Sequence, residues 1–329
     1  MEPERKSLRI GLIIICAGIL LRILGSGILT PMLNFLTRPD VASFLIYLET
    51  GRVIRLEAPH ETLPPETQSV LATTPSTGSE PIQFTQEDAG LVNLYHFSSL
   101  PVDETSLLLS PLNWNLRSEE PTVLILHSHA SECYTKTTED YEESYYRTQN
   151  TDYNMVRIGS RVAQLLEEAG IRVIHDRSLH DDPSYLGSYE NSRRSAKNIL
   201  AQHPSIFLIL DLHRDAADVN GGQLDTSATV DGRESAQLML VVGSNAGGLS
   251  HPHWQENMAL AEKLHVLLQK ENPGICRPIC FRNERFNQDL LPGTLLVEVG
   301  AAGNTLDEAL IAAEALAQAI IALADGANS

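Results

Sequence analysis

Continuous apolar runs alternate with amphipathic segments from Pro121 onward. The runs are rich in Val, Ile and Leu, and they lie at 123–129, 171–176, 206–213 and 294–300. A run without apolar–polar alternation is typical of a strand buried on both faces, and hence of a parallel sheet covered by helices. The alternation of strands and helices predicts an α/β fold, namely a three-layer αβα domain with a mostly parallel sheet.

The segments between these runs predict helices and one hairpin. Residues 152–170 carry an apolar helical stripe that stops at Gly170, and Thr305 and Glu308 form a capping box at the start of another helix. The full set of predicted helices lies at 152–170, 188–204, 254–274 and 305–323, and residues 221–243 predict a hairpin around Asp231 and Gly232.

A different pattern occupies the N-terminus. Ile10–Leu29 is almost entirely apolar, with Arg22 as its one charge. Twenty helical residues span about 30 Å, the thickness of a bilayer core. The basic residues before the span predict a cytoplasmic N-terminus and an extracytoplasmic remainder. We therefore expect residues 1–36 to be a single-pass anchor in the cell membrane. A cleaved signal peptide is the alternative, but no A-x-A site follows the span.

Residues 37–118 are rich in Pro, Ser, Thr and Glu and contain little that could fill a core. This composition predicts an extracytoplasmic linker region. Two apolar patches within it, at 41–49 and 89–97, are expected to be small helices or strands that dock elsewhere. The catalytic domain is expected at 119–329.

Composition narrows the possible functions. The 329 residues carry a net charge of −18, which argues against a nucleic-acid-binding protein because such proteins need a basic face. The four cysteines form no C-x-x-C pattern, so a structural zinc site is not expected. In an exported domain Cys276 could pair with Cys280, although their spacing alone is a weak signal.

Four polar residues stand at the ends of predicted strands: His129, Glu132, His213 and Glu298. Open α/β sheets bind ligands at the carboxyl ends of their strands, so these strand ends can meet in one cleft. His-x-x-Glu with a distant His supplies three zinc ligands and leaves one position open, the pattern of a hydrolytic site. The sequence therefore predicts Zn²⁺ held by His129, Glu132 and His213.

Glu298 is predicted to be the catalytic base. It lies between Val297 and Val299, and strand alternation points its side chain away from both. An apolar environment raises the pKa of a carboxyl group toward the range that is useful for general base catalysis.

Further polar residues are candidates for supporting the ligands or binding substrate: His127, His175, Asp211 and Arg214. His127 could orient a ligand or a bound water, and Arg214 could hold a substrate carboxylate or carbonyl. A simpler alternative for 211–215 is a salt-bridged strand end. Residues 175–182 (HDRSLHDD) admit a second metal site, but a hydrogen-bonded loop that shapes the cleft is the favoured interpretation.

Several motifs resemble the stage II sporulation protein P (SpoIIP) family, in family order, over about residues 121–324. They are LHSHASECY, RTQNTDYNMVRIG, GIRVIHDRSLHDDPSYLGSYENSRRS, HPSIFLILDLHRDA and RFNQDLLPGTLLVEVGAAGNTLDEA. The resemblance implies a zinc amidase of phosphorylase/hydrolase-like fold, an N-acetylmuramoyl-L-alanine amidase that also has endopeptidase activity. It further implies septal wall degradation and engulfment during sporulation, a membrane anchor, and SpoIID-like and SpoIIM-like partners.

One part of the motif set departs from the wider group of cell-wall amidases. LLVEVG is similar to the C-terminal glutamate motif of that group, whereas HSHASE replaces its Asp-Pro-Gly-His-Gly-Gly. The carboxylate ligand is therefore less firmly assigned than the two histidines, and Glu142 and Glu143 are alternatives.

Together these features predict a membrane-tethered zinc amidase that acts on peptidoglycan. A metallocarboxypeptidase acting on wall peptides is an enzymatic alternative, because it also uses His-x-x-Glu and a distant His. A catalytically silent wall-binding module that recruits partners is an alternative from another class.

Overall fold

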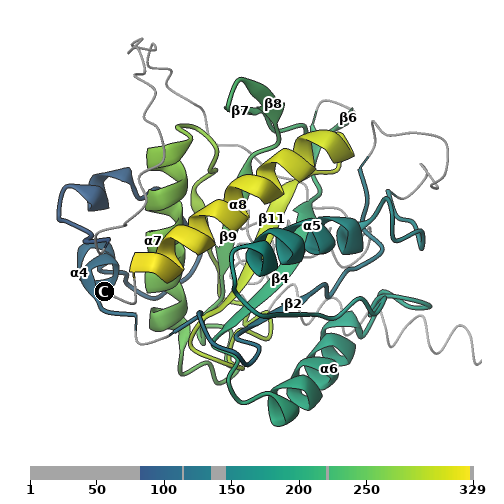
Figure 1. Cartoon of the computed structure of the whole chain (residues 1–329), viewed down its shortest axis with the longest axis horizontal. Helices are drawn as coiled ribbons and strands as arrows, with labels where there is room; N and C mark the ends of the chain where they lie inside the picture. The colour runs from purple at the N-terminus through teal and green to yellow at the C-terminus, as the bar shows by residue number, and fades with distance from the viewer. Residues whose placement is uncertain (1–81, 113–114, 135–145, 220–221, 327–329) are drawn as a thin grey trace, which may run out of the picture. The chain divides into compact units, whose positions relative to one another are not determined.

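The computed structural model describes residues 82–112, 115–134, 146–219 and 222–326 (Figure 1). All of them belong to one compact unit, Glu66–Ser329. The predicted membrane anchor and the apolar patch at 41–49 lie outside the described residues.

Seven strands form one mixed sheet in the order β1-β10-β9-β11-β4-β2-β3. Every neighbouring pair is parallel except β9 and β11, so the expected α/β fold with a mostly parallel sheet is observed. The strands are Leu94–His96 (β1), Val123–Leu126 (β2), Val173–His175 (β3), Leu208–Asp215 (β4), Leu238–Val242 (β9), Ile279–Phe281 (β10) and Thr294–Ala301 (β11).

The predicted hairpin at 221–243 is wrong in its extent. A hairpin does form around Asp231 and Gly232, but it joins only Ala228–Val230 (β7) to Arg233–Ser235 (β8). The following strand β9 enters the main sheet instead, because all five of its side chains are apolar and buried. Another short antiparallel pair joins Asp218–Val219 (β5) to Gly222–Gln223 (β6).

Helices cover the two faces of the sheet unequally (Figure 1). On one face the helices pack on the sheet and on one another; they are α4 (Glu104–Leu109), α5 (Met155–Glu168), α7 (Trp254–Glu271) and α8 (Leu306–Gly326). The described part of the opposite face carries one helix, α6 (Ser188–Gln202), which packs on β2 through Ala196. Phe286 packs on a small apolar cluster elsewhere on that face.

Strand alternation places Asp211 and His213 of β4 and Glu298 of β11 on the face that carries fewer of the described helices. Leu210 and Leu212 belong to the large core under α5, α7 and α8, so the intervening Asp211 and the following His213 point the other way. Val297 and Val299 belong to the same core, and Glu298 between them points to the opposite face. The two strands therefore present Asp211, His213 and Glu298 to one side of the sheet.

Helix capping follows the sequence. The Asn154 side chain accepts a hydrogen bond from the Val156 N–H (3.0 Å) at the start of α5. The predicted capping box at α8 is confirmed: the Thr305 N–H donates to Glu308 (2.9 Å), and the Glu308 N–H donates to the Thr305 hydroxyl (3.1 Å).

Among the described helices, α8 alone is long and apolar enough to cross a membrane. However, Ala313, Leu316 and Ile320 of α8 are buried in the large core, which is the ordinary setting of an apolar core helix.

Part of the predicted linker range contributes to this fold. A 3₁₀ turn at Asp88–Leu91 (η1), strand β1 and helix α4 all lie before residue 119, and β1 is an edge strand of the sheet. The apolar patch at 89–97 does dock, as expected. The composition did not predict these elements, because each is very short and lies among Pro, Ser and Thr residues.

Candidate metal centre

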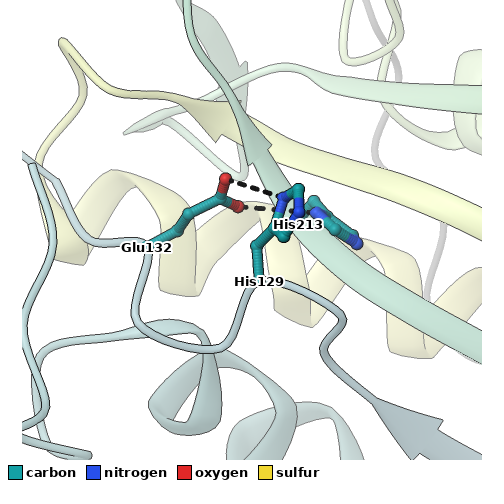
Figure 2. Close-up of side chains that lie close together, drawn as sticks. All are labelled: His129, Glu132 and His213. Atoms are coloured by element: carbon teal, nitrogen blue, oxygen red, sulfur yellow. Dashed lines mark ion pairs between the residues drawn. The ribbon is translucent and has the colours of Figure 1, made fainter. Parts of the chain in front are cut away.

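His129, Glu132 and His213 converge at the carboxyl ends of β2 and β4 (Figure 2). Oε1 of Glu132 lies 3.4 Å from Nδ1 of His129, and Oε2 lies 3.5 Å from Nδ1 of His213. All three side chains are buried, and their possible ligand atoms lie within 4.8 Å of one another. The predicted ligand residues are thus brought together, although 81 residues separate Glu132 from His213.

The turn that carries His129 and Glu132 is fixed by hydrogen bonds from outside it. The Glu132 N–H donates to the His129 carbonyl (3.2 Å), which closes the turn. Between them, Ser131 donates its hydroxyl to Asp181 (2.6 Å). The Met155 N–H donates to the Glu132 carbonyl (3.1 Å), so the turn is also tied to the start of α5.

Asp211 contacts the ring nitrogen of His213 that does not face Glu132. Nε2 of His213 lies 2.9 Å from Oδ1 of Asp211, at ion-pair distance, although it lacks the angle of a hydrogen bond. Ser128 donates its N–H (2.7 Å) and its hydroxyl (2.6 Å) to the same carboxylate. Burial lowers the pKa of His213, but Asp211 and Glu132 outweigh this effect and raise it well above its usual value. Asp211 thus holds one ring nitrogen while the other faces Glu132.

Arg214 compensates the buried charge of Glu132. Burial raises the pKa of Glu132, but Arg214 outweighs this effect together with His129 and His213, and the pKa falls well below its usual range. The Arg214 guanidinium donates to the carbonyls of Cys133 (2.8 Å) and Tyr146 (2.7 Å). The side chain therefore braces the turn that carries His129 and Glu132.

Glu298 lies beside His213 in the sheet, because the two residues are register partners on β11 and β4. Its Oε2 is buried and has no hydrogen-bond partner in the described part of the chain. Burial, reinforced by Asp215 and opposed by His213, raises the pKa of Glu298 to about 8. This is a carboxyl group that can exchange a proton near neutral pH.

His127 and His175 lie apart from this cluster. The His127 Nδ1–H donates to the Leu212 carbonyl (3.0 Å), which leaves Nε2 to accept from Nε2 of His175 (2.9 Å). Burial lowers the pKa of His127 to about 4 and that of His175 to about 3. Both rings pack closely against Gly159 of α5, on the face of the sheet away from Glu298.

Residues 175–182 form the hydrogen-bonded loop favoured by the sequence. His180 lies 3.0 Å from Oδ2 of Asp176, and Ser195 of α6 also donates to this carboxylate (2.5 Å). Asp181 supports the ligand turn, as described above. Among the described residues, His129, Glu132 and His213 are the one group with metal-ligand spacing. Glu142 and Glu143 lie outside the described residues.

The aromatic and basic side chains around the cluster were not predicted from the sequence. The Tyr185 ring lies 4.3 Å from the His129 ring, and the Tyr189 ring lies 5.3 Å from it (centroid distances). The Arg147 guanidinium lies 4.6 Å from the centroid of Tyr185. Tyr185 and Tyr189 are four residues apart at the start of α6, whereas Arg147 comes from a distant loop, so no local spacing connects it with the two tyrosines.

The donor set is compatible with Zn²⁺. Two imidazole nitrogens and one carboxylate oxygen are the ligand types of catalytic zinc sites, which keep a fourth position open.

Cys133, Cys276 and Cys280 are free and buried, so the suggested pairing of Cys276 with Cys280 is not formed.

The model of one protein family, "Stage II sporulation protein P (SpoIIP)", matches residues 48–321. The chain belongs to the SpoIIP family. The stage II sporulation protein P of Bacillus subtilis (strain 168) is 30% identical over 210 residues, which cover 60% of this chain and 50% of that protein. The chain thus spans about half the length of the curated relative it matches. The family resemblance expected from the motifs is confirmed.

Solved structures with a similar fold are N-acetylmuramoyl-L-alanine amidases. AmiC2 of Nostoc punctiforme has 16% identity and a TM-score of 0.37, covering 60% of this chain and 94% of that one. Ami1 of Mycobacterium smegmatis has 14% identity and a TM-score of 0.39, covering 64% and 98%. The CwlD amidase of Clostridioides difficile, solved with the GerS lipoprotein, has 12% identity and a TM-score of 0.37, covering 62% and 94%.

Proposed function

We propose that this SpoIIP-family protein is a zinc-dependent peptidoglycan hydrolase that cleaves the amide between N-acetylmuramic acid and L-alanine. The observation that carries the proposal is the convergence of His129, Glu132 and His213 next to Glu298. Membership of the SpoIIP family, whose resemblance implies an amidase, supports the same chemistry.

In this proposal His129, Glu132 and His213 hold the zinc ion. When bound, zinc supplies Lewis acidity, which activates water and polarises the amide carbonyl. Glu298 accepts a proton from the attacking water and passes it to the leaving nitrogen of L-alanine as the C–N bond breaks. The buried Oε2 of Glu298 supports this role, because it has no hydrogen-bond partner among the described residues.

Asp211 and Arg214 are assigned supporting roles. Asp211 fixes the ring orientation of His213, and Arg214 fixes the turn that carries Glu132. Residues that hold metal ligands in place in this way raise the affinity for the metal.

We further propose that residues 1–36 anchor the protein in the membrane and that the rest of the chain lies outside the cytoplasm, including the catalytic domain, to which β1 and α4 contribute. Ile10–Leu29 and the basic residues before it support this topology. A role in septal wall degradation with SpoIID-like and SpoIIM-like partners follows from the family resemblance. Protease added to intact protoplasts removes the catalytic domain if the topology is correct, and leaves it whole if the domain is cytoplasmic.

The test combines metal analysis with mass spectrometry of products from purified peptidoglycan. Full-chain protein should bind one zinc and release peptides, leaving muramic acid with a free lactyl carboxylate. His129→Ala and His213→Ala should each lose both zinc and turnover, while His203→Ala at the end of α6 serves as the matched control.

Other products would support other functions. Release of a terminal amino acid identifies a carboxypeptidase, and cleavage within the peptide identifies an endopeptidase. Zinc binding without any turnover identifies a silent wall-binding module. Full zinc content and turnover in both histidine variants would show that the site is wrongly placed.

A further inference from the structure

Arg147 lies beside the metal-ligand cluster and has no role in the chemistry described above. Its Nη2 is 3.5 Å from Oε1 of Glu132. A backbone bridge pairs Arg147 with Glu132, and the Thr148 N–H donates to the Ser131 carbonyl (2.8 Å). The Arg147 backbone is therefore fixed directly against the ligand turn.

Among the described residues, the guanidinium of Arg147 is held mainly through Nη1. Its Nη1 donates to Asp181 (2.7 Å) and to the Ser131 hydroxyl (3.2 Å). The Tyr185 ring lies at 4.6 Å and itself contacts the His129 ring, so guanidinium, phenol ring and imidazole are arranged in series. These contacts fix the plane of the guanidinium before any ligand arrives.

The other side of the guanidinium has spare hydrogen-bonding capacity. Among the described residues, the 3.5 Å contact with Glu132 is the one polar contact of Nη2, which carries two N–H donors. The Arg147 side chain is 30% exposed, whereas Arg214, the other cation at the ligand turn, is buried and donates to two carbonyls. A fixed, partly exposed guanidinium matches a negatively charged oxygen.

We propose that Arg147 binds a negatively charged oxygen of the substrate immediately beside the metal ligands. This inference rests on the proposed function and extends it with a substrate-contact residue. Two sources supply such an oxygen in a muramyl peptide: the carbonyl oxygen of the scissile amide, which becomes an oxyanion as water attacks, and a carboxylate of the peptide stem.

The test compares wild-type full-chain protein with Arg147→Gln and Arg147→Lys. Arg161→Gln is the matched control, because Arg161 is also a half-exposed, ion-paired arginine, yet it pairs with Glu314 in the helix layer across the sheet. Measurements are zinc content, kcat and KM on wall fragments, and calorimetric binding of muramyl peptides to the metal-free protein. The peptides are used with free and with amidated carboxyl groups.

Either of two results supports the inference. For an oxyanion contact, kcat falls by roughly 10²–10³ in Arg147→Gln while KM and zinc content hold. For a carboxylate contact, KM rises and the metal-free protein loses roughly 10- to 100-fold in affinity for the free-carboxyl peptide, with the amidated peptide unaffected. In both cases Arg147→Lys falls short of wild type, because an ammonium lacks the planar fork.

Two results overturn the inference. One is Arg147→Gln with kcat, KM and peptide affinity all within about twofold of Arg161→Gln. The other is loss of zinc in step with activity in both Arg147 variants, which would make the arginine only a brace of the turn. Absence of turnover in the zinc-loaded wild type would instead refute the proposed function, and peptide binding to the metal-free protein would still test Arg147.

Discussion

Glu262 of α7 carries a buried carboxyl group, and its effect on the free energy of unfolding can be measured. Its side chain is 0% exposed, and neither carboxylate oxygen has a hydrogen-bond partner in the described part of the chain. Burial raises the pKa of Glu262 to about 8; Glu104 and Asp103 reinforce the shift, and Lys263 opposes it. Lys263 donates instead to the carbonyls of Leu107 and Leu108 in α4.

This shift makes the folded state less stable as pH rises. Between the ordinary carboxyl pKa of 4.5 and about 8, folded Glu262 keeps a proton that the unfolded chain has released. The folded state then binds more protons, so the free energy of unfolding falls with pH across this window. Each pH unit inside the window costs about 1.4 kcal/mol, so the step from pH 5 to pH 7 costs about 3 kcal/mol.

Glu262→Gln removes this ionisation and keeps the shape of the side chain. The free energy of unfolding of the variant, minus that of wild type, should rise by about 3 kcal/mol from pH 5 to pH 7. Urea denaturation of full-chain protein with a metal chelator measures the difference, in which the titration of buried histidines cancels. Glu256→Gln is the control, because Glu256 lies on the same helix with its side chain 54% exposed. A Glu262→Gln curve that runs parallel to wild type over this range would refute the reasoning.

Three further variants test the site and the fold. Glu298→Gln should keep its zinc and lose turnover by roughly 10²–10⁴, since only the basic atom is removed; loss of zinc would make Glu298 a ligand. Asp211→Asn should weaken zinc binding by roughly 10- to 100-fold in a chelator competition, and unchanged affinity would remove its supporting role. Asn304→Ala should lower the free energy of unfolding by about 3 kcal/mol in urea, because Asn304 is buried and its side chain bonds Thr226 and the Ala301 N–H.

The ligand cluster was predictable because its signals are local. His129 and Glu132 are three residues apart after one strand, and His213 ends another, so parallel pairing alone brings the three together. The orientation of Glu298 follows from Val297 and Val299, which occupy the core on the other face. Because side chains alternate between the two faces of a sheet, the sequence of a long strand predicts the face on which each side chain lies.

The sequence pattern did not predict side-chain directions beyond the end of a strand. Residues two apart on a strand point to the same face, but β2 ends at Leu126, so this alternation does not extend to His127 and His129. His127 therefore turns toward α5, and the turn carries His129 toward His213. The contacts of Arg147 with Asp181 and Tyr185 were equally hidden, since they depend on how two distant loops pack.

The unequal helix cover also explains why chemistry is concentrated on one face. The helices α5, α7 and α8 cover one side of the central strands. A polar side chain buried on that side destabilises the fold unless it is hydrogen-bonded. The described helix on the opposite side is α6, which lies beside β2 (Figure 1). The polar side chains Asp211, His213 and Glu298 all point to this second side. A substrate of the proposed amidase would therefore reach Glu298 from the α6 side, where Tyr185, Tyr189 and Arg147 lie around His129.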